Sequence, residues 1–173
     1  MTLKAIPLLL ILAAPLRAEP AYFCIVYAEQ APGPRPPISS THVFAVWLKL
    51  EGSVIVERVV FNFSNRGHEP ITKAIAEAHA ARCVLVRWIL RTDATFFEMA
   101  RQHKATMPKR WRLTGQGLLA TNCTNAVSGV AGFNVGLAHG IPGGQVVVNA
   151  FVRRGLATAS SDFWVADLVE AGR

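Results

Sequence analysis

A cysteine lies where a helical pattern of apolar residues begins, in the segment Thr121-Asn122-Cys123-Thr124-Asn125-Ala126-Val127. Thr121 or Asn122 can cap this helix, because their side-chain oxygens accept hydrogen bonds from free backbone N–H groups. Cys123 then falls in the first turn, where the helix dipole favours a thiolate. A thiolate there can act as a nucleophile. The alternative role for the same residue is that of a small buried hydrophobic side chain.

A thiolate nucleophile needs a base, and the chain contains five histidines. His42 stands at the head of an otherwise apolar strand pattern, where a histidine is costly to bury without a partner. The other four lie in less suitable surroundings. His68 is in a polar loop and His139 is in a glycine-rich loop. His79 and His103 are on helical segments beside charged residues, where we expect exposure. His42 is therefore the candidate base, with a satisfied core or edge histidine as the alternative.

Two consecutive strands must position this histidine. Residues 41–50 alternate so that His42 shares a face with Phe44, and residues 54–63 are rich in β-branched side chains. The intervening Glu51-Gly52-Ser53 reads as a turn, so the two strands are expected to form an antiparallel hairpin.

The turn length decides which residue faces His42. A three-residue turn places Asn62 directly opposite, on the same face, whereas a two-residue turn places Phe61 there. In this strand pattern Ser64 lies on the same face as Asn62, whereas Glu57 lies on the opposite face. We therefore predict that Asn62 orients the imidazole, with Ser64 and Glu57 as the alternatives.

The remaining patterns supply two more strands and several helices. Pro70 suits a first helical turn, Asp93 suits a cap, and Gly155 suits the end of a helix. Phe163 and Trp164 are expected to be buried in the last helix. The predicted fold is α+β, a small antiparallel sheet packed with helices. The further strands are expected at 21–28 and 83–90, and the helices at 71–81, 94–105, 123–131, 142–154 and 161–171, with a strand as the alternative for 142–154.

The N-terminus resembles an export signal. A basic Lys4 precedes an apolar run from Ala5 to Leu16, and Leu16-Arg17-Ala18 can serve as a cleavage site. The apolar run is too short to span a bilayer, and no later segment is long enough either. The sequence therefore predicts a signal peptide over 1–18 and one domain over 19–173, exported to the periplasm or the extracellular space.

Composition limits the partners. The formal charge is +7, and loss of Lys4 and Arg17 with the leader leaves +5. Mild basicity favours anionic surfaces such as the cell wall, but the chain carries no nucleic-acid-binding motif. Its cysteine and histidine spacings match no zinc site, and it contains no phosphate loop, so no cofactor is expected. In an exported protein Cys24 and Cys83 can pair as a disulfide or remain buried thiols, which leaves Cys123 unpaired.

The order of these residues resembles the circularly permuted NlpC-like branch of the papain fold. His42-Val43-Phe44-Ala45-Val46 is similar to that branch's histidine-bearing first core strand. Asn122-Cys123-Thr124-Asn125-Ala126-Val127 is similar to the Asn-Cys-Glu-His-Phe-Val motif of lecithin retinol acyltransferase-like proteins. Thr124 and Asn125 depart from the Glu and His of that motif. The resemblance covers about residues 41–132 and implies a papain-like, circularly permuted arrangement.

The resemblance also implies a chemistry. Cys123 would attack a carbonyl carbon, His42 would act as its base and later protonate the leaving group, and Asn62 would orient the imidazole. The backbone N–H of Cys123, and Gln116 upstream of it, would stabilise the oxyanion. The expected substrate is a peptide, a cell-wall component or an acyl compound, cleaved by peptidase, amidase or acyl-transfer chemistry. The alternative is a non-catalytic exported binding or structural module on the same fold.

Overall fold

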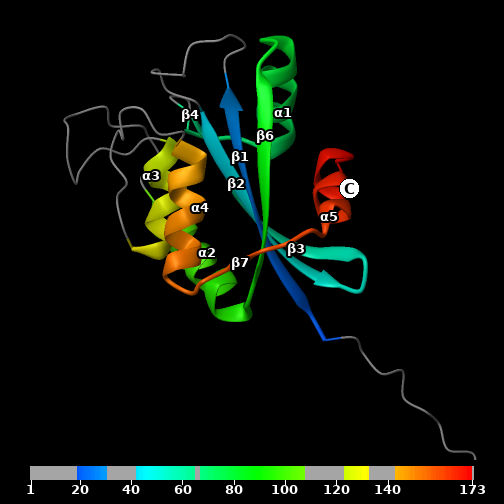
Figure 1. Ribbon diagram of the computed structural model, residues 1–173, viewed down its shortest axis with the longest axis vertical. Coiled ribbons are helices and arrows are strands. Elements are labelled where there is room, and N and C mark those ends of the chain that lie inside the picture. Colours follow the sequence, from blue (N-terminus) through cyan, green and yellow to red (C-terminus); the bar gives the residue numbers. More distant parts are fainter. Residues whose placement is uncertain (1–18, 31–41, 65–66, 108–122, 133–142, 173) are drawn as a thin grey trace, which may run out of the picture.

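An antiparallel sheet forms the middle layer of the protein (Figure 1). The computed structural model describes residues 19–30, 42–64, 67–107, 123–132 and 143–172. Within them the fold is α+β, as predicted, with five strands in the order β3-β2-β1-β6-β7. The strands are β1 (Ala21–Gln30), β2 (Val43–Glu51), β3 (Val54–Phe61), β6 (Val84–Thr92) and β7 (Thr158–Ala159). A separate small hairpin joins β4 (Phe63–Ser64) to β5 (Gly67–His68).

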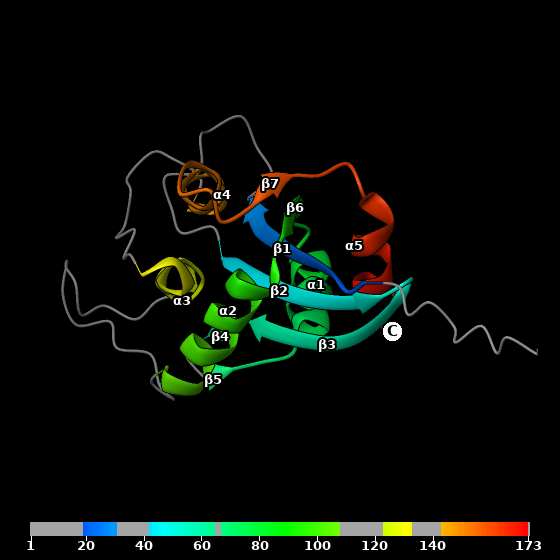
Figure 2. The ribbon, with the colours of Figure 1, turned by 90° about the horizontal axis from the view of Figure 1, so that it is seen from below.

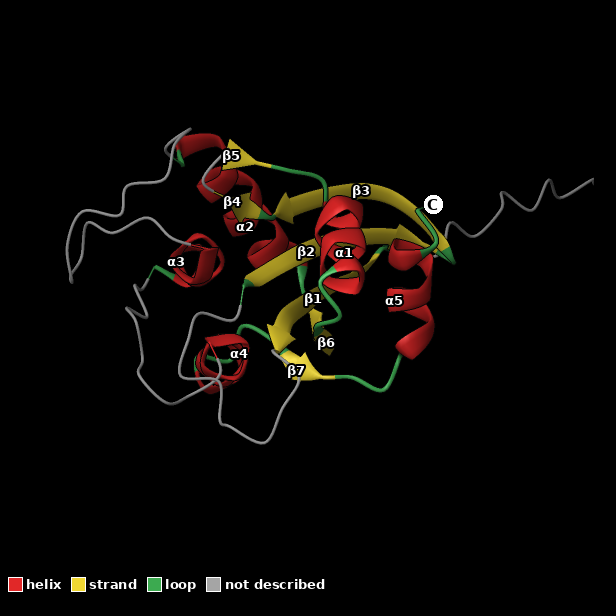
Figure 3. Ribbon diagram, turned by 90° about the horizontal axis from the view of Figure 1, so that it is seen from above, coloured by secondary structure: helices red, strands yellow, loops and turns green. Residues whose placement is uncertain are grey.

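Helices cover both faces of the sheet, as Figures 2 and 3 show from below and from above. One face carries α1 (Ile71–Ala80) and α5 (Phe163–Glu170). The opposite face carries α2 (Ala94–Thr106), α4 (Gly143–Arg153) and α3 (Cys123–Ser128), which continues as the 3₁₀ turn η1 (Gly129–Ala131).

Each face of the sheet has its own apolar core because side chains alternate along a strand. In β2, Val43, Ala45 and Trp47 pack towards α2, α3 and α4. Phe44 and Val46 pack towards α1 and α5. All five are fully buried, so β2 contributes side chains to both cores.

The β2–β3 hairpin reaches its register by a different route from the predicted one. Glu51 pairs with Val54, so the turn contains two residues, not three. A bulge then places Val56 outside the ladder, since Leu50 pairs with Ile55 and Lys49 with Glu57. The shorter turn exchanges the two faces of β3 relative to the prediction, and the extra residue in the bulge exchanges them back. Asn62 therefore keeps the face that the sequence predicted, although the turn does not.

Asp93, Gly132 and Gly155 stand at helix ends as predicted, whereas Pro70 is the N-cap residue of α1 and precedes its first turn, and the last helix is shorter than predicted. Asp93 Oδ1 accepts a hydrogen bond from the Phe96 N–H at 2.8 Å and caps α2. Gly132 and Gly155 follow η1 and α4 with φ of +72° and +69°, a conformation that favours glycine. Asp162 precedes α5 without a capping hydrogen bond, because its carboxylate accepts from the Ser160 hydroxyl instead.

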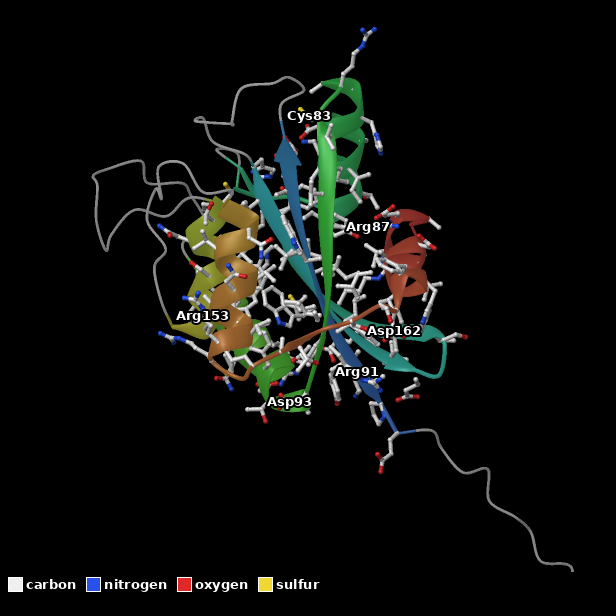
Figure 4. All side chains as sticks on the ribbon, in the orientation of Figure 1. Cys83, Arg87, Arg91, Asp93, Arg153 and Asp162 are labelled. Atoms are coloured by element: carbon white, nitrogen blue, oxygen red, sulfur yellow. The ribbon has the colours of Figure 1, made fainter. Side chains whose placement is uncertain are left out.

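The alternative of a Cys24–Cys83 disulfide is wrong. Cys24 pairs with Leu90 in the sheet, whereas Cys83 precedes Val84, whose partner is Gln30. Six residues of β1 separate the two positions, about 20 Å at the rise of a strand. Figure 4 shows Cys83 at the end of β6 opposite to Arg91. All three cysteines are free thiols.

The burial predicted for Phe163 and Trp164 is also wrong. Their side chains are 58% and 43% exposed, while Val165, Ala166 and Val169 form the buried face of α5. Arg87 on β6 also fixes this helix. Its side chain points towards α5 (Figure 4) and donates a hydrogen bond to Glu170 at 2.7 Å. The buried residues of α5 share one face of the helix, and Phe163 and Trp164 in its first turn lie outside that face.

Among the described residues, no helix has the length and apolar character required to cross a bilayer. The proposed signal peptide, residues 1–18, lies outside the described part of the chain.

Candidate functional site

The three candidate catalytic residues meet at one end of the sheet. His42 immediately precedes β2, Asn62 immediately follows β3, and Cys123 is the first residue of α3. His42 stays in line with the sheet because its carbonyl accepts a hydrogen bond from the Glu29 N–H at 3.0 Å. Two neighbouring strand ends and a helix therefore converge on the same point from segments far apart in the sequence.

His42 and Asn62 are directly hydrogen-bonded. His42 Nε2 lies 2.8 Å from Asn62 Oδ1, and the Asn62 amide Nδ2 donates to the Pro70 carbonyl at 3.0 Å. The Pro70 carbonyl can only accept, so it fixes which end of the amide faces the histidine. Oδ1 is then the acceptor, and Nε2 must carry a proton. Asn62 is 2% exposed, and this pairing of both ends explains how its polar group is buried.

The remaining imidazole nitrogen is left for Cys123. Cys123 and His42 lie close enough for hydrogen bonding and charge to shift the pKa of both groups. Because Nε2 is held by Asn62, Nδ1 is the nitrogen that can accept the thiol proton. Two further groups contact the sulfur: the backbone N–H of Val43 donates to it, and the Thr124 hydroxyl lies 4.0 Å away. Both side chains of the pair are partly buried.

The electrostatics favour an ion pair. Burial alone would lower the pKa of His42, but the hydrogen bond and charge of Cys123, the bond to Asn62 and the charge of Glu29 together raise it to about 9. Burial alone would raise the pKa of Cys123, yet the hydrogen bond and charge of His42, with the contacts from Val43 and Thr124, hold it below the usual thiol value. Each group thus stabilises the charged form of the other, which favours a thiolate–imidazolium pair.

The other candidates for orienting His42 differ in position. Glu57 pairs with Lys49 in the ladder, far along β3 from the site and on the opposite face to Asn62. Ser64 belongs to β4, where it pairs with Gly67. Gln116, the predicted oxyanion donor, lies outside the described residues, as do the capping candidates Thr121 and Asn122 and the histidine His139.

Several contributors to the site escaped prediction. The Val43 N–H and the Pro70 carbonyl are backbone groups, and no side-chain pattern identifies them. Glu29 is one residue beyond the predicted end of the first strand, and it acts on His42 because β1 and β2 are neighbours. Gly143 opens α4 beside the nucleophile: a Cβ there would lie 3.2 Å from Thr124 Oγ1 and 3.2 Å from Val43 Cγ2.

His68, predicted in a polar loop, and His103, predicted to be exposed, are both partly buried. Both ring nitrogens of His68 are buried and have no hydrogen-bond partner among the described residues. Burial, with the charges of Lys104 and His103, lowers the pKa of His68 to about 4. His103 is partly buried, and its Nε2 lies 3.1 Å from the Ala126 carbonyl. Charged neighbours in the sequence indicated exposure, but α2 packs this face against the sheet end.

Among the described residues, no group of three or more His, Cys, Asp or Glu side chains could hold a metal ion. No known protein family, curated protein or solved structure matches the chain.

Proposed function

We propose that this chain is an exported thiol hydrolase that uses Cys123 as nucleophile, His42 as base and Asn62 to orient the base. The proposal rests on one observation above all. His42 is bonded through Nε2 to the buried Asn62 carboxamide while its ring also bonds the Cys123 thiol. A purely structural cysteine would gain nothing from a partner that lowers its pKa, whereas a nucleophile needs one.

The geometry supports a two-step acyl transfer. The Cys123 thiolate attacks the substrate carbonyl carbon, and a tetrahedral oxyanion forms. As the carbonyl re-forms, the bond to the leaving amine or alcohol breaks, and protonated His42 supplies the proton that this group takes away. Water then attacks the thioester, with neutral His42 accepting its proton. The carbon–sulfur bond then breaks and the carboxylic acid leaves; because His42 keeps the proton taken from water, the thiolate–imidazolium pair is restored.

Asn62 would support both steps. Its Oδ1 holds Nε2–H, so the ring cannot turn away while Nδ1 gains and loses a proton. The Pro70 carbonyl fixes the orientation of the Asn62 amide, so its uncharged oxygen faces His42 as the acceptor. The oxyanion would be stabilised by backbone N–H groups near Cys123, and Gln116 stays a candidate for the same role.

The chain order supports the papain-like, circularly permuted arrangement as part of the proposal. Histidine and its orienting residue come from neighbouring strands, and the cysteine follows on a helix that packs against the sheet. With the expected export signal, this favours substrates outside the cytoplasm. We propose a peptide, a cell-wall component or an acyl compound as the substrate class.

Selective alkylation tests the proposed thiolate. At about pH 6, where an ordinary thiol of pKa about 8.5 is almost wholly protonated, iodoacetamide should label Cys123 ahead of the partly exposed Cys83. His42→Ala should abolish this preference. Equal labelling of Cys83 and Cys123 at this pH would contradict an activated nucleophile.

Turnover is tested separately with peptide, cell-wall and acyl ester or amide substrates. Cys123→Ser should lower kcat by at least about a thousandfold, and Cys83→Ser, as the matched control, should leave it unchanged. A reactive Cys123 with no turnover of any substrate class would instead favour a binding module that uses the same residues.

A further inference from the structure

His103 connects the helix of the nucleophile to the strand of the orienting residue. Its ring lies on α2, and the Ala126 carbonyl that it faces at 3.1 Å belongs to α3, three residues after Cys123. A carbonyl oxygen can only accept, so His103 Nε2 carries the proton and donates it. Burial lowers the pKa of His103, so the ring that makes this bond is the neutral one near pH 7.

The ring also packs tightly against the continuation of that helix. A Cβ built on Gly129 would lie 2.6 Å from both Cε1 and Nε2 of His103. Real Cβ atoms do not approach so closely, so the ring can occupy this position because residue 129 has no side chain. The hydrogen bond and this close approach together fix α3 and η1 with respect to α2.

The ring also contacts the end of β3, which directly precedes Asn62. His103 stacks on Phe61 with ring centroids 5.6 Å apart and planes 21° from parallel. Phe61 is fully buried and directly precedes Asn62. The next residue on α2 strengthens the same junction, because Lys104 Nζ donates to the Val60 carbonyl at 2.7 Å.

We propose that His103 is a positioning residue that sets the distance between Cys123 and the His42–Asn62 pair. Its ring lies between α3, which begins with the nucleophile, and the end of β3, which leads into Asn62. The inference rests on the proposed function, and it adds a residue that touches none of the reacting atoms. The groups facing His103 are Phe61, Gly129, the Ala126 carbonyl and the charged or titratable neighbours Lys104 and His68.

The physical reason is that the attraction between a thiolate and an imidazolium weakens as they separate. Loss of the bond to the Ala126 carbonyl would let α3 shift at its start, and the Cys123 thiolate would lose stabilisation from His42. The substrate-binding surface need not change. A positioning role therefore predicts a change in thiol reactivity and kcat, with KM little altered.

His103→Phe and His103→Gln separate the two contacts. Phenylalanine keeps a ring against Phe61 and removes the donor to Ala126, whereas glutamine places an amide N–H where Nε2 lies and removes the ring. The readout is the pH profile of Cys123 alkylation, followed by mass spectrometry. We expect His103→Phe to move the profile up by about one pKa unit, so that labelling at acidic pH becomes about tenfold slower. His103→Gln should recover part of this loss.

The matched control is His79→Phe on α1, an exposed histidine. It should leave the alkylation profile unchanged. If His103→Phe does not fold, as judged by circular dichroism, Gly129→Ala provides the second variant, since its Cβ displaces the ring. We expect the same upward shift.

Each outcome is decisive. A folded His103→Phe or Gly129→Ala protein with the wild-type profile would overturn the positioning role and leave the proposed function intact. A wild-type Cys123 that does not react selectively at mildly acidic pH would overturn the proposed function, and this inference with it.

Discussion

His42 and Asn62 are joined by a hydrogen bond of 2.8 Å between Nε2 and Oδ1, although the two residues are not partners in the β-ladder. The last paired positions of β2 and β3 are Ala45 and Phe61. Beyond them the strands end, and the Asn62 side chain is oriented by the Pro70 carbonyl at the start of α1. The contact is therefore fixed by a third segment as well as by strand register.

Removal of the Asn62 carboxamide should impair catalysis without unfolding the site. A hydrogen bond to a charged group contributes about 1.5–3 kcal/mol, so Asn62→Ala should lower kcat/KM by about 10- to 100-fold. The matched control is Asn149→Ala, an exposed asparagine on α4, which should retain full activity. An Asn62→Ala enzyme with wild-type kcat/KM would show that the imidazole is oriented by other groups.

Activity should occupy a window of pH bounded by the two groups of the ion pair. The pKa of Cys123 is lowered and that of His42 is raised to about 9, so the thiolate–imidazolium form persists between them. We expect kcat/KM to fall above about pH 9, as His42 loses the proton that the leaving group requires. A pH–rate profile checks this limit, and an alkaline limb near the ordinary histidine value would contradict it.

The same shift predicts a stability effect with a definite sign. The folded pKa of His42 is above the ordinary histidine value of 6.5, so the folded protein holds this proton more tightly than the unfolded chain does. The stabilisation is fully present below pH 6.5 and is lost as pH rises through about 9. Denaturant titrations across that range should show the loss in wild type and a smaller one in His42→Ala.

Stability should not depend on a disulfide. Cys24 is fully buried among apolar side chains, whereas Cys83 is partly exposed at the end of α1. Reduction should therefore leave the melting temperature unchanged. Cys24→Ser should lower the free energy of unfolding by about 1–3 kcal/mol because it buries a hydroxyl, and Cys83→Ser should change it little. A drop in Tm on reduction would contradict three free thiols.

Gly144 should be required for the packing of α4 on the sheet. A Cβ there would lie 2.6 Å from Trp88 Cζ3 and 2.9 Å from the Ala28 Cβ, which belongs to a central strand and cannot move aside. Gly144→Ala should destabilise the protein by about 1–3 kcal/mol despite the better helix propensity of alanine. The matched control is Gln145→Ala, on the same helix. Gly132→Ser is not a suitable control, because the φ of Gly132 is positive and a substitution there would itself strain the backbone. Equal unfolding curves for Gly144→Ala and wild type would contradict this packing.

The sequence by itself determined the elements whose signals are local. Alternation of apolar residues identified the strands that carry His42 and Asn62, and Asp93 and Gly155 marked helix ends because caps depend on neighbouring residues alone. The face of the strand on which Asn62 lies was also predicted correctly. The two-residue turn and the bulge at Val56 each exchange the two faces, so their effects cancel.

Only the tertiary structure decided which distant groups meet. The Pro70 carbonyl, the Val43 N–H and His103 contribute through contacts between segments that no local pattern relates. The same holds for the burial of His68 and the exposure of Trp164, because burial depends on which element packs over a residue. Local sequence sets the conformation of a segment, but the free energy of packing apolar faces together decides its neighbours.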